Sequence, residues 1–492
     1  MCQSDDAQEL PVTFRPELYL QRRGWVLDIM RREGITEVLD IGCGEGELLS
    51  CLCNPAPWLA PPPPDVLPTI DADATPTSTD GEIARELHKG ILHPVRIAGL
   101  DVSRADLEYA VEATRRRTPG SGAYALWHDP VRWEPLEAKI WEGSLAVVNP
   151  EFVGVECIVS TEVIEHLPED VLQAFAPTIF GVYHPRIVLL TTPSYTFNAR
   201  FTAPDAPIAA RSGWPDPTKR TARIFRHHDH KFEWTVEEFA QWCNGVAEEW
   251  GYDVELGGVG KAQEVDEWGR DEALGWASQV AAFKRREGRE WEERRAKQVD
   301  ELGILERTTV QGGHQLLATH HHPPHEAARR PQPLDVVGEL VVSKMIQFRE
   351  ASIPLRELWF DDAVAVACGG WVDWLIRAVR QYDGLCLGKE ALISGDPGEA
   401  VVRLEPSLQD LIPPASQASP PDTDEVGDPW NAFSDDDDAD EVRVATDEGH
   451  EEESGWGEPD VEWDREAAAK FSVDTRWGDP QGDDWSCSSE WT

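Results

Sequence analysis

Two carboxylates and an imidazole lie close together in the segment TEVIEHL, residues 161–167. Glu162, Glu165 and His166 are spaced i, i+3 and i+4, so in a helical turn their side chains share one face. Carboxylate oxygens suit a hard divalent cation such as Mg²⁺, and the imidazole shifts the preference toward Mn²⁺. The triplet therefore predicts a divalent metal site. The alternative for such a triplet alone is an exposed acidic helix start.

A second group of imidazoles lies in the segment FRHHDHKFEWT, residues 225–235. It contains His227, His228 and His230, and it follows the next strand that we expect along the chain. One of these imidazoles could supply a fourth ligand to the carboxylate and histidine triplet. The two segments together favour a metal site over an acidic helix start.

A glycine loop with the sequence DIGCGEG follows the expected strand Glu37–Ile41 and opens a helix. This is where open α/β sheets bind nucleotides. Glu45 and Glu47 would repel a pyrophosphate at the helix start, which favours a cofactor without phosphates, such as S-adenosylmethionine. Asp101, after the next strand, can accept hydrogen bonds from a ribose. A structural turn and an NAD site are the alternatives. The candidate cofactor residues here are Asp40, Gly42, Gly44, Gly46 and Asp101.

Short β-branched runs alternate with helical stretches along the first half of the chain, which predicts a mostly parallel α/β sheet. The expected strands are Glu37–Ile41, Arg96–Val102, Glu156–Ser160, Ile187–Thr191, Tyr252–Val259 and Ser278–Phe283. The expected helices are Gly46–Cys53, Arg104–Arg117, Pro168–Val182 and Val236–Trp250. These elements place one catalytic domain at residues 14–286 and bring the glycine loop and TEVIEHL to the same sheet edge.

Four segments differ in composition from this domain. Residues 54–82 contain a run of prolines and are expected to form a disordered surface insertion. Residues 307–333 contain four close histidines and are interpreted as a solvated linker rather than a metal site. Residues 334–413 have helical periodicity and are expected to form a small α-helical accessory region. Residues 414–492 are expected to be a disordered acidic tail, because 25 acidic and only 4 basic residues lie after position 420.

Acidic residues dominate the composition: Asp plus Glu number 91 against 45 Lys plus Arg, for a formal net charge of −46. This excludes a generally basic nucleic-acid coat or a polybasic membrane binder, so any RNA contact must be local. The nine cysteines lack disulfide-framework spacing, which indicates reduced thiols. No apolar run approaches the ~20 residues of a membrane span. We expect a soluble cytoplasmic protein, with the nucleus as the alternative location and no membrane partner.

These motifs as a set resemble those of the 3′-terminal small-RNA 2′-O-methyltransferases. The resemblance covers about residues 14–286 and includes Phe14-Arg15-Pro16 with Gln21-Arg22, DIGCGEG, GLDVS, EGSL, TEVIEHL and DHKFEWT. It implies a Rossmann-like class I methyltransferase sheet. The sequence departs from the family pattern at the 54–82 insertion and at Glu17, where the family usually shows a second proline.

The resemblance also implies a function and a set of site residues. The activity would be metal-dependent methyl transfer from S-adenosylmethionine to the 2′-hydroxyl of the 3′-terminal nucleotide of small RNAs, which protects them from 3′ tailing and degradation. The implied metal and catalytic residues are Glu162, Glu165, His166 and His230, with Mg²⁺ or Mn²⁺ as the ion. Cofactor contacts carry over to Gly46, Asp101 and Ser144. The implied substrate is a single-stranded RNA 3′ end, and we expect a monomer.

Two further segments are candidates for partner contacts. Residues 199–231 carry seven basic and three acidic residues, so they are the candidate RNA cradle, with Phe197 and Phe201 as stacking platforms; a solvated loop with core aromatics is the alternative. In the tail, Trp456 and Trp477 beside glycines resemble the hooks that insert tryptophan into Argonaute proteins. The alternative for the tail is a solubilising segment. For the whole chain, the alternatives are a small-molecule diol methyltransferase and a non-catalytic scaffold.

Overall fold

An eight-stranded sheet organises the larger part of the chain in the computed structural model, which describes residues 9–68, 78–116, 130–207, 210–304, 313–390 and 399–413. In spatial order the strands are β10 (Gln315–His322), β3 (Leu136–Glu142), β2 (Arg96–Asp101), β1 (Glu37–Ile41), β4 (Cys157–Thr161), β5 (Ile187–Pro193), β9 (Ser278–Arg285) and β8 (Tyr252–Val259). Strands β3, β2, β1, β4 and β5 are parallel, whereas β9 is antiparallel to both neighbours. The mostly parallel α/β sheet is therefore confirmed.

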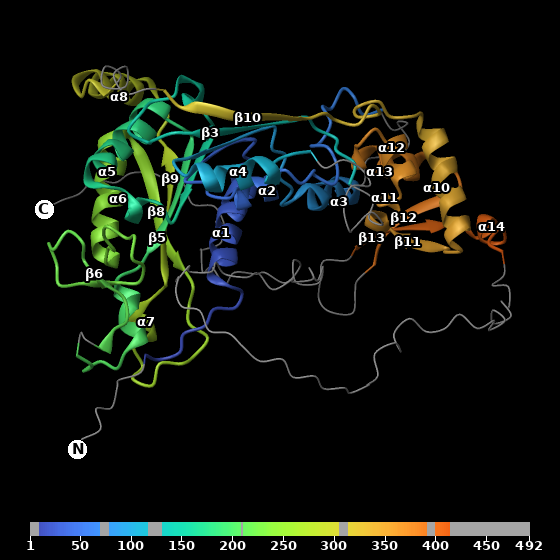
Figure 1. Cartoon of the computed structure of the whole chain (residues 1–492). Coiled ribbons are helices and arrows are strands. Elements are labelled where there is room, and N and C mark those ends of the chain that lie inside the picture. Colours follow the sequence, from blue (N-terminus) through green and yellow to red (C-terminus); the bar gives the residue numbers. More distant parts are fainter. Residues whose placement is uncertain are drawn as a thin grey trace, which may run out of the picture. The chain divides into compact units, whose positions relative to one another are not determined.

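Helices cover both faces of this sheet (Figure 1). Helices α1 (Leu18–Glu33), α2 (Glu47–Leu52) and α4 (Arg104–Ala113) share one apolar core, and α5 (Glu169–Ala176), α6 (Val236–Trp250) and α8 (Arg289–Glu301) share the other. Within β1, Val38 packs into the first core and Leu39 into the second, because successive strand residues point to opposite faces. Among the described helices, none combines the length and apolar character needed to cross a bilayer.

The strand order reverses at β1, which has β2 on one side and β4 on the other. The chain runs outward from β1 to β2 and β3 and then crosses back to β4. In open α/β sheets, ligands bind at such a switch point, outside the carboxyl ends of the two strands. Here those ends carry the glycine loop after β1 and the TEVIEHL segment after β4, as the sequence predicted.

The prediction of a solvated linker at 307–333 is wrong for residues 315–322. These residues form β10, which pairs antiparallel with β3 at the edge of the sheet. The Nε2 atom of His322, a buried residue, lies 3.0 Å from the Thr114 carbonyl oxygen, and His320 Nδ1 lies 3.2 Å from Thr114 Oγ1. The histidines therefore hold an edge strand against the loop after α4. Together with α8, this strand extends the catalytic unit beyond residue 286.

The accessory region at 334–413 is not purely α-helical. It combines α10 (Leu334–Phe348), α11 (Leu355–Trp359), α12 (Asp362–Ala367), α13 (Val372–Gln381) and α14 (Pro406–Gln409) with a three-stranded antiparallel sheet of β11 (Ser352–Pro354), β13 (Glu399–Leu404) and β12 (Leu385–Glu390). The helical period was visible in the sequence, whereas the short strands were not, and β11 pairs with β13 across the helices α11, α12 and α13. The acidic tail expected over 414–492 lies outside the described residues.

The insertion at 54–82 packs against this accessory region and is not a bare surface loop, although residues 69–77 lie outside the described ones. Trp58 and Leu59 are buried in the same apolar core as α13, together with residues of α3 (Ser78–His88). The Pro57 carbonyl accepts hydrogen bonds from the indoles of Trp133 (3.1 Å) and Trp359 (2.7 Å). Apolar burial and these bonds explain why a proline-rich stretch is ordered here.

Candidate active site

The glycine loop after β1 uses left-handed backbone at three positions. Gly42, Gly44 and Gly46 have φ of +72°, +50° and +84°. A Cβ atom on Gly42 would lie 2.3 Å from Val163 Cγ2, and one on Gly46 would lie 2.9 Å from the Ala110 backbone. Glycine at these two positions therefore lets the loop pack directly on the turn after β4 and on α4. At Gly44 there is open space, so only the backbone conformation favours glycine.

One carboxylate holds this loop by hydrogen bonds, and a second carboxylate is buried next to it. Asp101 accepts the Gly44 N–H through Oδ2 (2.9 Å) and the Ser103 N–H through Oδ1 (2.8 Å). Asp40 is buried, and its Oδ1 atom has no hydrogen-bond partner among the described residues. Burial, and next the charge of Asp101, raise the pKa of Asp40 to about 7. The floor of the site is therefore suited to a ligand that brings a donor or a positive charge.

A cavity of about 280 Å³ opens between the glycine loop, α1 and the end of β4. Its lining comprises Tyr19, Arg22, Arg23, Val26, Asp40, Gly42, Cys43, Gly44, Glu45, Glu47, Leu48, Thr161 and Glu162. Of the predicted cofactor residues, Asp40, Gly42 and Gly44 line it, whereas Gly46, Asp101 and Ser144 do not. Gly46 caps α2, and Ser144 Oγ accepts the Ala146 N–H (3.2 Å). The cavity thus runs from the glycine loop to the first predicted metal ligand.

The TEVIEHL segment does not form the helical turn that was expected to carry all three of its ligands. Only Ile164–His166 is helical, as a single 3₁₀ turn, and Glu162 precedes it in the left-handed region at φ 54°. Such a conformation costs a non-glycine residue about 1–3 kcal/mol. Thr191 holds it there, because its carbonyl accepts the Glu162 N–H (3.0 Å) and its hydroxyl donates to Glu162 Oε1 (2.8 Å).

The carboxylate of Glu162 also receives a hydrogen bond from Arg22. The Arg22 Nη1 atom lies 3.1 Å from Glu162 Oε2 and 3.1 Å from Ser278 Oγ. The sequence flagged Arg22 only as part of the resembling Gln21-Arg22 pair, and no site role was predicted for it. In the fold, α1 brings this arginine to the point where the cofactor cavity meets the predicted metal site.

Glu165 is fully buried and only partly satisfied. Its Oε2 atom accepts a hydrogen bond from Thr192 Oγ1 (2.9 Å), but Oε1 has no partner among the described residues. Burial, and next the charge of Glu162, raise the pKa of Glu165 well above its usual range. A buried carboxylate oxygen without a donor is unfavourable unless a proton or a cation meets it. The donor set around Glu165 therefore fits a divalent cation.

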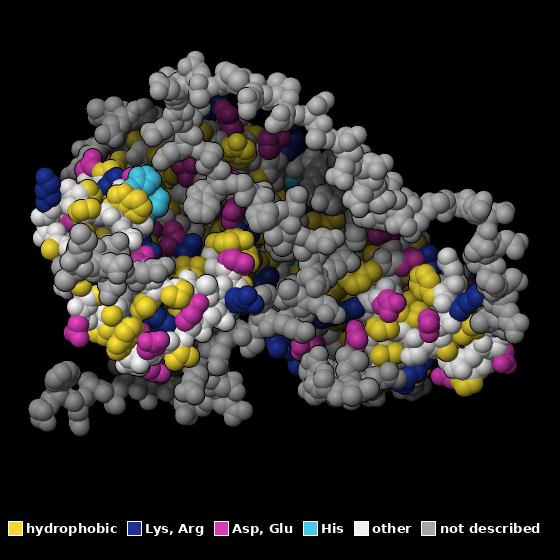
Figure 2. Space-filling model, turned by 60° about the horizontal axis from the view of Figure 1, so that its bottom comes forward, with side chains coloured by type: hydrophobic (Ala, Val, Ile, Leu, Met, Phe, Trp, Pro, Cys, Tyr) yellow, Lys and Arg dark blue, Asp and Glu magenta, His cyan; other side chains and the backbone are white. Residues whose placement is uncertain are grey.

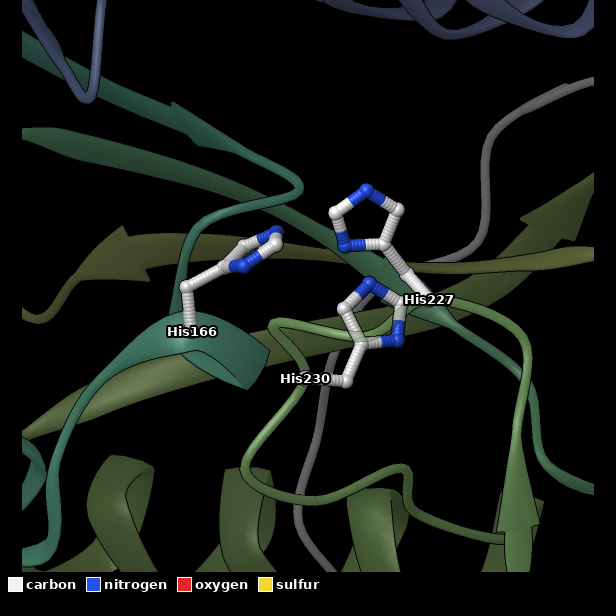
Figure 3. Close-up of side chains that lie close together, drawn as sticks. All are labelled: His166, His227 and His230. Carbon is white, nitrogen blue, oxygen red and sulfur yellow. The ribbon is translucent and has the colours of Figure 1, made fainter. Parts of the chain in front are cut away.

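Three imidazoles face one another beside these carboxylates (Figure 3). His166, His227 and His230 each offer one nitrogen, and these nitrogens lie within 4.8 Å of one another. The ring centroids are 4.8 Å apart for His166 and His230 and 5.2 Å for His227 and His230. The predicted pair His166 and His230 is therefore brought together, and His227 joins it. Within the described residues, Glu162 and Glu165 lie outside this 4.8 Å group.

Hydrogen bonds orient the histidines and join the two segments. His230 Nδ1 lies 2.7 Å from Glu233 Oε1 and His166 Nδ1 lies 3.2 Å from Asp229 Oδ2, so both rings keep Nε2 available. The Lys231 N–H donates to the Glu165 carbonyl (2.7 Å), which ties the histidine loop to the turn after β4. Glu233 was quoted in DHKFEWT, and its place three residues after His230 is the signal that could have identified it.

Burial keeps two of these imidazoles neutral. It lowers the pKa of His166, and the nearby His230 lowers it further. The pKa of His227 is lowered by burial and then by His230 and His228. Neutral imidazole is the form that binds a metal ion, so the lowered pKa values of His166 and His227 favour their ligand form.

Most basic side chains of the candidate RNA cradle, residues 199–231, lie beside acidic partners of the same chain. Five of its seven basic side chains make ion pairs: Arg200 with Asp266, Arg220 with Glu169, Arg223 with Glu238, Arg226 with Glu9 and Lys231 with Asp229. Phe197 is buried, and the guanidinium of Arg226 lies 3.9 Å from the ring centroid of Phe201. The stacking role expected for Phe197 is therefore wrong, because its ring belongs to the interior.

Comparisons with known proteins agree with the motifs. No protein-family model matches the chain. Small RNA 2′-O-methyltransferases are similar to it. The Arabidopsis thaliana relative is 28% identical over 275 residues, which are 55% of this chain and 23% of the relative. The Drosophila melanogaster relative is 34% identical over 157 residues (32% of this chain, 36% of the relative), and the Schizosaccharomyces pombe relative is 27% identical over 282 residues (55% of this chain, 61% of the relative). The chain thus spans less than two thirds of the length of these relatives.

Among solved structures, small RNA methyltransferase HEN1 is 26% identical, with a TM-score of 0.38 over 57% of this chain and 26% of that one. The methyltransferase domain of bacterial CtHen1-C is 24% identical, with a TM-score of 0.34 over 55% and 99% of the two chains. The sheet order β3-β2-β1-β4-β5-β9-β8 is that of a Rossmann-like class I methyltransferase, so the expected fold class is confirmed. By sequence, more than half of the chain is related to the small RNA 2′-O-methyltransferases, the family that its motifs resemble.

Proposed function

We propose that this protein transfers a methyl group from S-adenosylmethionine to the 2′-hydroxyl of the 3′-terminal nucleotide of small RNAs and so protects them from 3′ tailing and degradation. The observation that carries the proposal is the cavity that joins the glycine loop to Glu162, beside the buried Glu165 and the histidine cluster. The similarity to small RNA 2′-O-methyltransferases supports 2′-O-methylation of small RNA. We propose that the protein acts as a monomer in the cytoplasm.

The cavity suits S-adenosylmethionine because it offers charges of both signs. Arg22 and Arg23 can meet the carboxylate of the cofactor, and Asp40, Glu45 and Glu47 can meet its ammonium and sulfonium groups. Bound there, the cofactor supplies an electrophilic methyl group. The glycine loop contributes close backbone approach, and Asp101 keeps that loop in place through the Gly44 N–H.

The residues that would hold Mg²⁺ or Mn²⁺ are Glu162, Glu165, His166 and His230, with His227 beside them. A divalent cation at this place lowers the pKa of a ribose hydroxyl and fixes its oxygen. The open Oε1 of Glu165 and the two available Nε2 atoms support this ligand set. Glu162 would exchange its contact with Arg22 for the ion. A 3′-terminal ribose offers a free vicinal diol, which an internal ribose lacks, so it is the acceptor that this donor set would suit.

Methyl transfer to matched RNAs tests the proposal. The protein is incubated with S-adenosylmethionine, Mn²⁺ or Mg²⁺ and a small RNA that carries either a 3′-hydroxyl or a 3′-phosphate, and the RNA is then treated with periodate. We expect resistance to periodate only for the 3′-hydroxyl RNA in the presence of metal. His166→Ala should abolish transfer with cofactor binding retained, since His166 does not line the cavity. Sensitivity under every condition would refute the proposal.

A second candidate is a metal-dependent methyltransferase for a small-molecule diol. The ion-paired arginines of residues 199–231 favour it, because they weaken the case for a basic RNA-binding surface. The same ligands would serve both reactions. Transfer to a catechol with no transfer to RNA would establish the small-molecule reaction.

We also propose that the tail docks an Argonaute protein through Trp456 and Trp477. Tethering would raise the local concentration of the enzyme near its RNA. The support is the pairing of these tryptophans with glycine in an acidic segment. Recovery of an Argonaute on the full-length chain should fall in the Trp456→Ala, Trp477→Ala double variant, and equal recovery would contradict the proposal.

A further inference from the structure

One exposed tryptophan lies directly beside the histidine cluster. Trp214 is 48% exposed. The centroid of its ring lies 5.9 Å from the ring centroid of His228 and 6.4 Å from that of His227. Figure 2 shows surface histidines gathered at one place with hydrophobic side chains next to them. Neither the proposed metal ligands nor the cofactor cavity includes Trp214. The position therefore calls for a function of its own.

The strand that carries Trp214 is held firmly. It is part of β6 (Trp214–Pro215), which pairs antiparallel with β7 (Ile224–Phe225). A Cβ atom on Gly213 would lie 2.2 Å from the Phe225 carbonyl oxygen, so the two strands approach closely. Asp216 closes the hairpin, because its carboxylate accepts four hydrogen bonds from the N–H and hydroxyl groups of Thr218 and Thr221.

The same hairpin is fixed to the histidine cluster through a single buried carboxylate. Glu233 Oε1 accepts the Arg226 N–H (2.7 Å), directly after β7, and lies 2.7 Å from His230 Nδ1. Glu233 Oε2 accepts Asn198 Nδ2 (2.6 Å). The indole and the proposed ligand His230 are therefore positioned by a common anchor. An exposed indole held at a set place beside a reaction centre is suited to bind a part of the substrate.

We propose that the indole of Trp214 is the stacking platform for a nucleobase at the 3′ end of the RNA. This inference rests on the proposed function, since it takes the acceptor ribose to lie at the histidine cluster. A ribose bound there carries its base outward, and Trp214 is the exposed aromatic ring beside His227 and His228. Every base has a π face, so a stacking contact tolerates any 3′-terminal sequence. The ion-paired arginines nearby fit this view, because base stacking then supplies affinity that phosphate contacts do not.

The test compares Trp214→Ala with Trp268→Ala, a control tryptophan of similar exposure (44%) whose ring lies under Arg270. Binding of a short 5′-labelled, 3′-hydroxyl RNA is measured by fluorescence anisotropy, and methyl transfer gives kcat and KM. Stacking predicts that Trp214→Ala raises Kd by about 5- to 140-fold and raises KM more than it lowers kcat. Trp214→Phe should restore most of the affinity, and Trp268→Ala should bind like the parent chain.

An RNA whose 3′-terminal and preceding nucleotides lack bases isolates the contact itself. It keeps the terminal diol, so the parent protein should bind it more weakly by a similar factor. On this RNA, the Kd of Trp214→Ala should exceed that of the parent protein by less than about twofold. Equal losses by Trp214→Ala on the normal and the abasic RNA would overturn the inference, because the ring would then act only on the fold. If the parent protein methylates no RNA, the proposed function itself fails, which is a distinct result.

Discussion

Glu233 is the carboxylate on which the account of the metal site depends most, and Glu233→Gln is the variant that tests it. The side chain is fully buried, and its two oxygens meet three donors: His230 Nδ1, the Arg226 N–H and Asn198 Nδ2. Glutamine keeps one carbonyl oxygen and adds an amide that can only donate. If the glutamine oxygen accepts from His230 and Arg226, its NH₂ group faces the NH₂ group of Asn198, and neither can accept a hydrogen bond. In the reverse orientation, the His230 and Arg226 donors have no acceptor.

The expected magnitude follows from those contacts. A hydrogen bond to a charged group contributes about 1.5–3 kcal/mol and a neutral one about 0.5–1.5 kcal/mol. Glu233→Gln replaces a charged acceptor by a neutral one and leaves at least one donor without an acceptor. It should therefore lower the free energy of unfolding by about 1–4 kcal/mol. Changing the partner that orients a ligating histidine typically weakens metal binding about 10- to 100-fold. We expect Glu233→Gln to lose Mn²⁺ affinity by that factor in calorimetric titration.

Glu238→Gln is the matched control. Its carboxylate is five residues away and accepts two hydrogen bonds from Arg223 and one from the Thr235 N–H, but it makes no contact with a histidine. We expect this variant to lose stability with Mn²⁺ affinity unchanged. If Glu233→Gln binds Mn²⁺ as tightly as the parent, or if both variants lose affinity equally, Glu233 does not position His230 for a metal.

Three further outcomes follow from the site. Because the pKa of Glu165 is raised in the folded state, folding takes up a proton, and stability falls as pH rises above 4.5. In denaturant titrations at pH 7 without metal, Glu165→Gln should therefore raise the free energy of unfolding by about 1–3 kcal/mol. Mn²⁺ should not stabilise this variant further. Metal binding should weaken as pH falls, because Glu165, whose pKa is raised, and His166 must both be deprotonated to bind the ion; Mn²⁺ affinity that stays constant from pH 8 to pH 5 in a titration series would contradict the assignment. Gly42→Ala should weaken S-adenosylmethionine binding in calorimetry more than Gly44→Ala does, because only the first new Cβ meets Val163, and equal losses would argue against the packing role.

The sequence predicted six of the eight strands, including the edge strand β8, but it missed β3 and the other edge strand, β10. Strands such as β4 and β5 are continuous apolar runs because both of their faces are buried. Strand β3, with the sequence LEAKIWE, alternates charged and apolar residues, and β10 is a polar edge strand rich in histidine. Their pairing with each other was not visible in local composition. The burial of Trp58 likewise depends on Trp359, about 300 positions later.

For the site, the resemblance paired His166 with His230, and the fold brings the two rings together although His230 follows the short hairpin strand β7 and not a strand of the large sheet. The helical spacing within TEVIEHL predicted one shared face for its three ligands. It was not enough to place Glu162, because the turn after β4 is left-handed there and not helical. Arg22 could be found only from the fold, because it comes from α1. Glu233 had a signal in the sequence, its place three residues after His230, but the contact itself is seen only in the structure. The charge excess of residues 199–231 did not reveal that most of its basic side chains have acidic partners elsewhere in the chain.

The most direct test of the proposed reaction locates the methyl group. RNA incubated with the protein, S-adenosylmethionine and Mn²⁺ is digested to nucleosides, and the products are identified by liquid chromatography and mass spectrometry. The account predicts one 2′-O-methyl nucleoside per RNA, derived from the 3′-terminal position, and none when that nucleotide lacks its 3′-hydroxyl. Methylation of a base or of an internal ribose, or methylation that persists on the RNA without a 3′-hydroxyl, would contradict it.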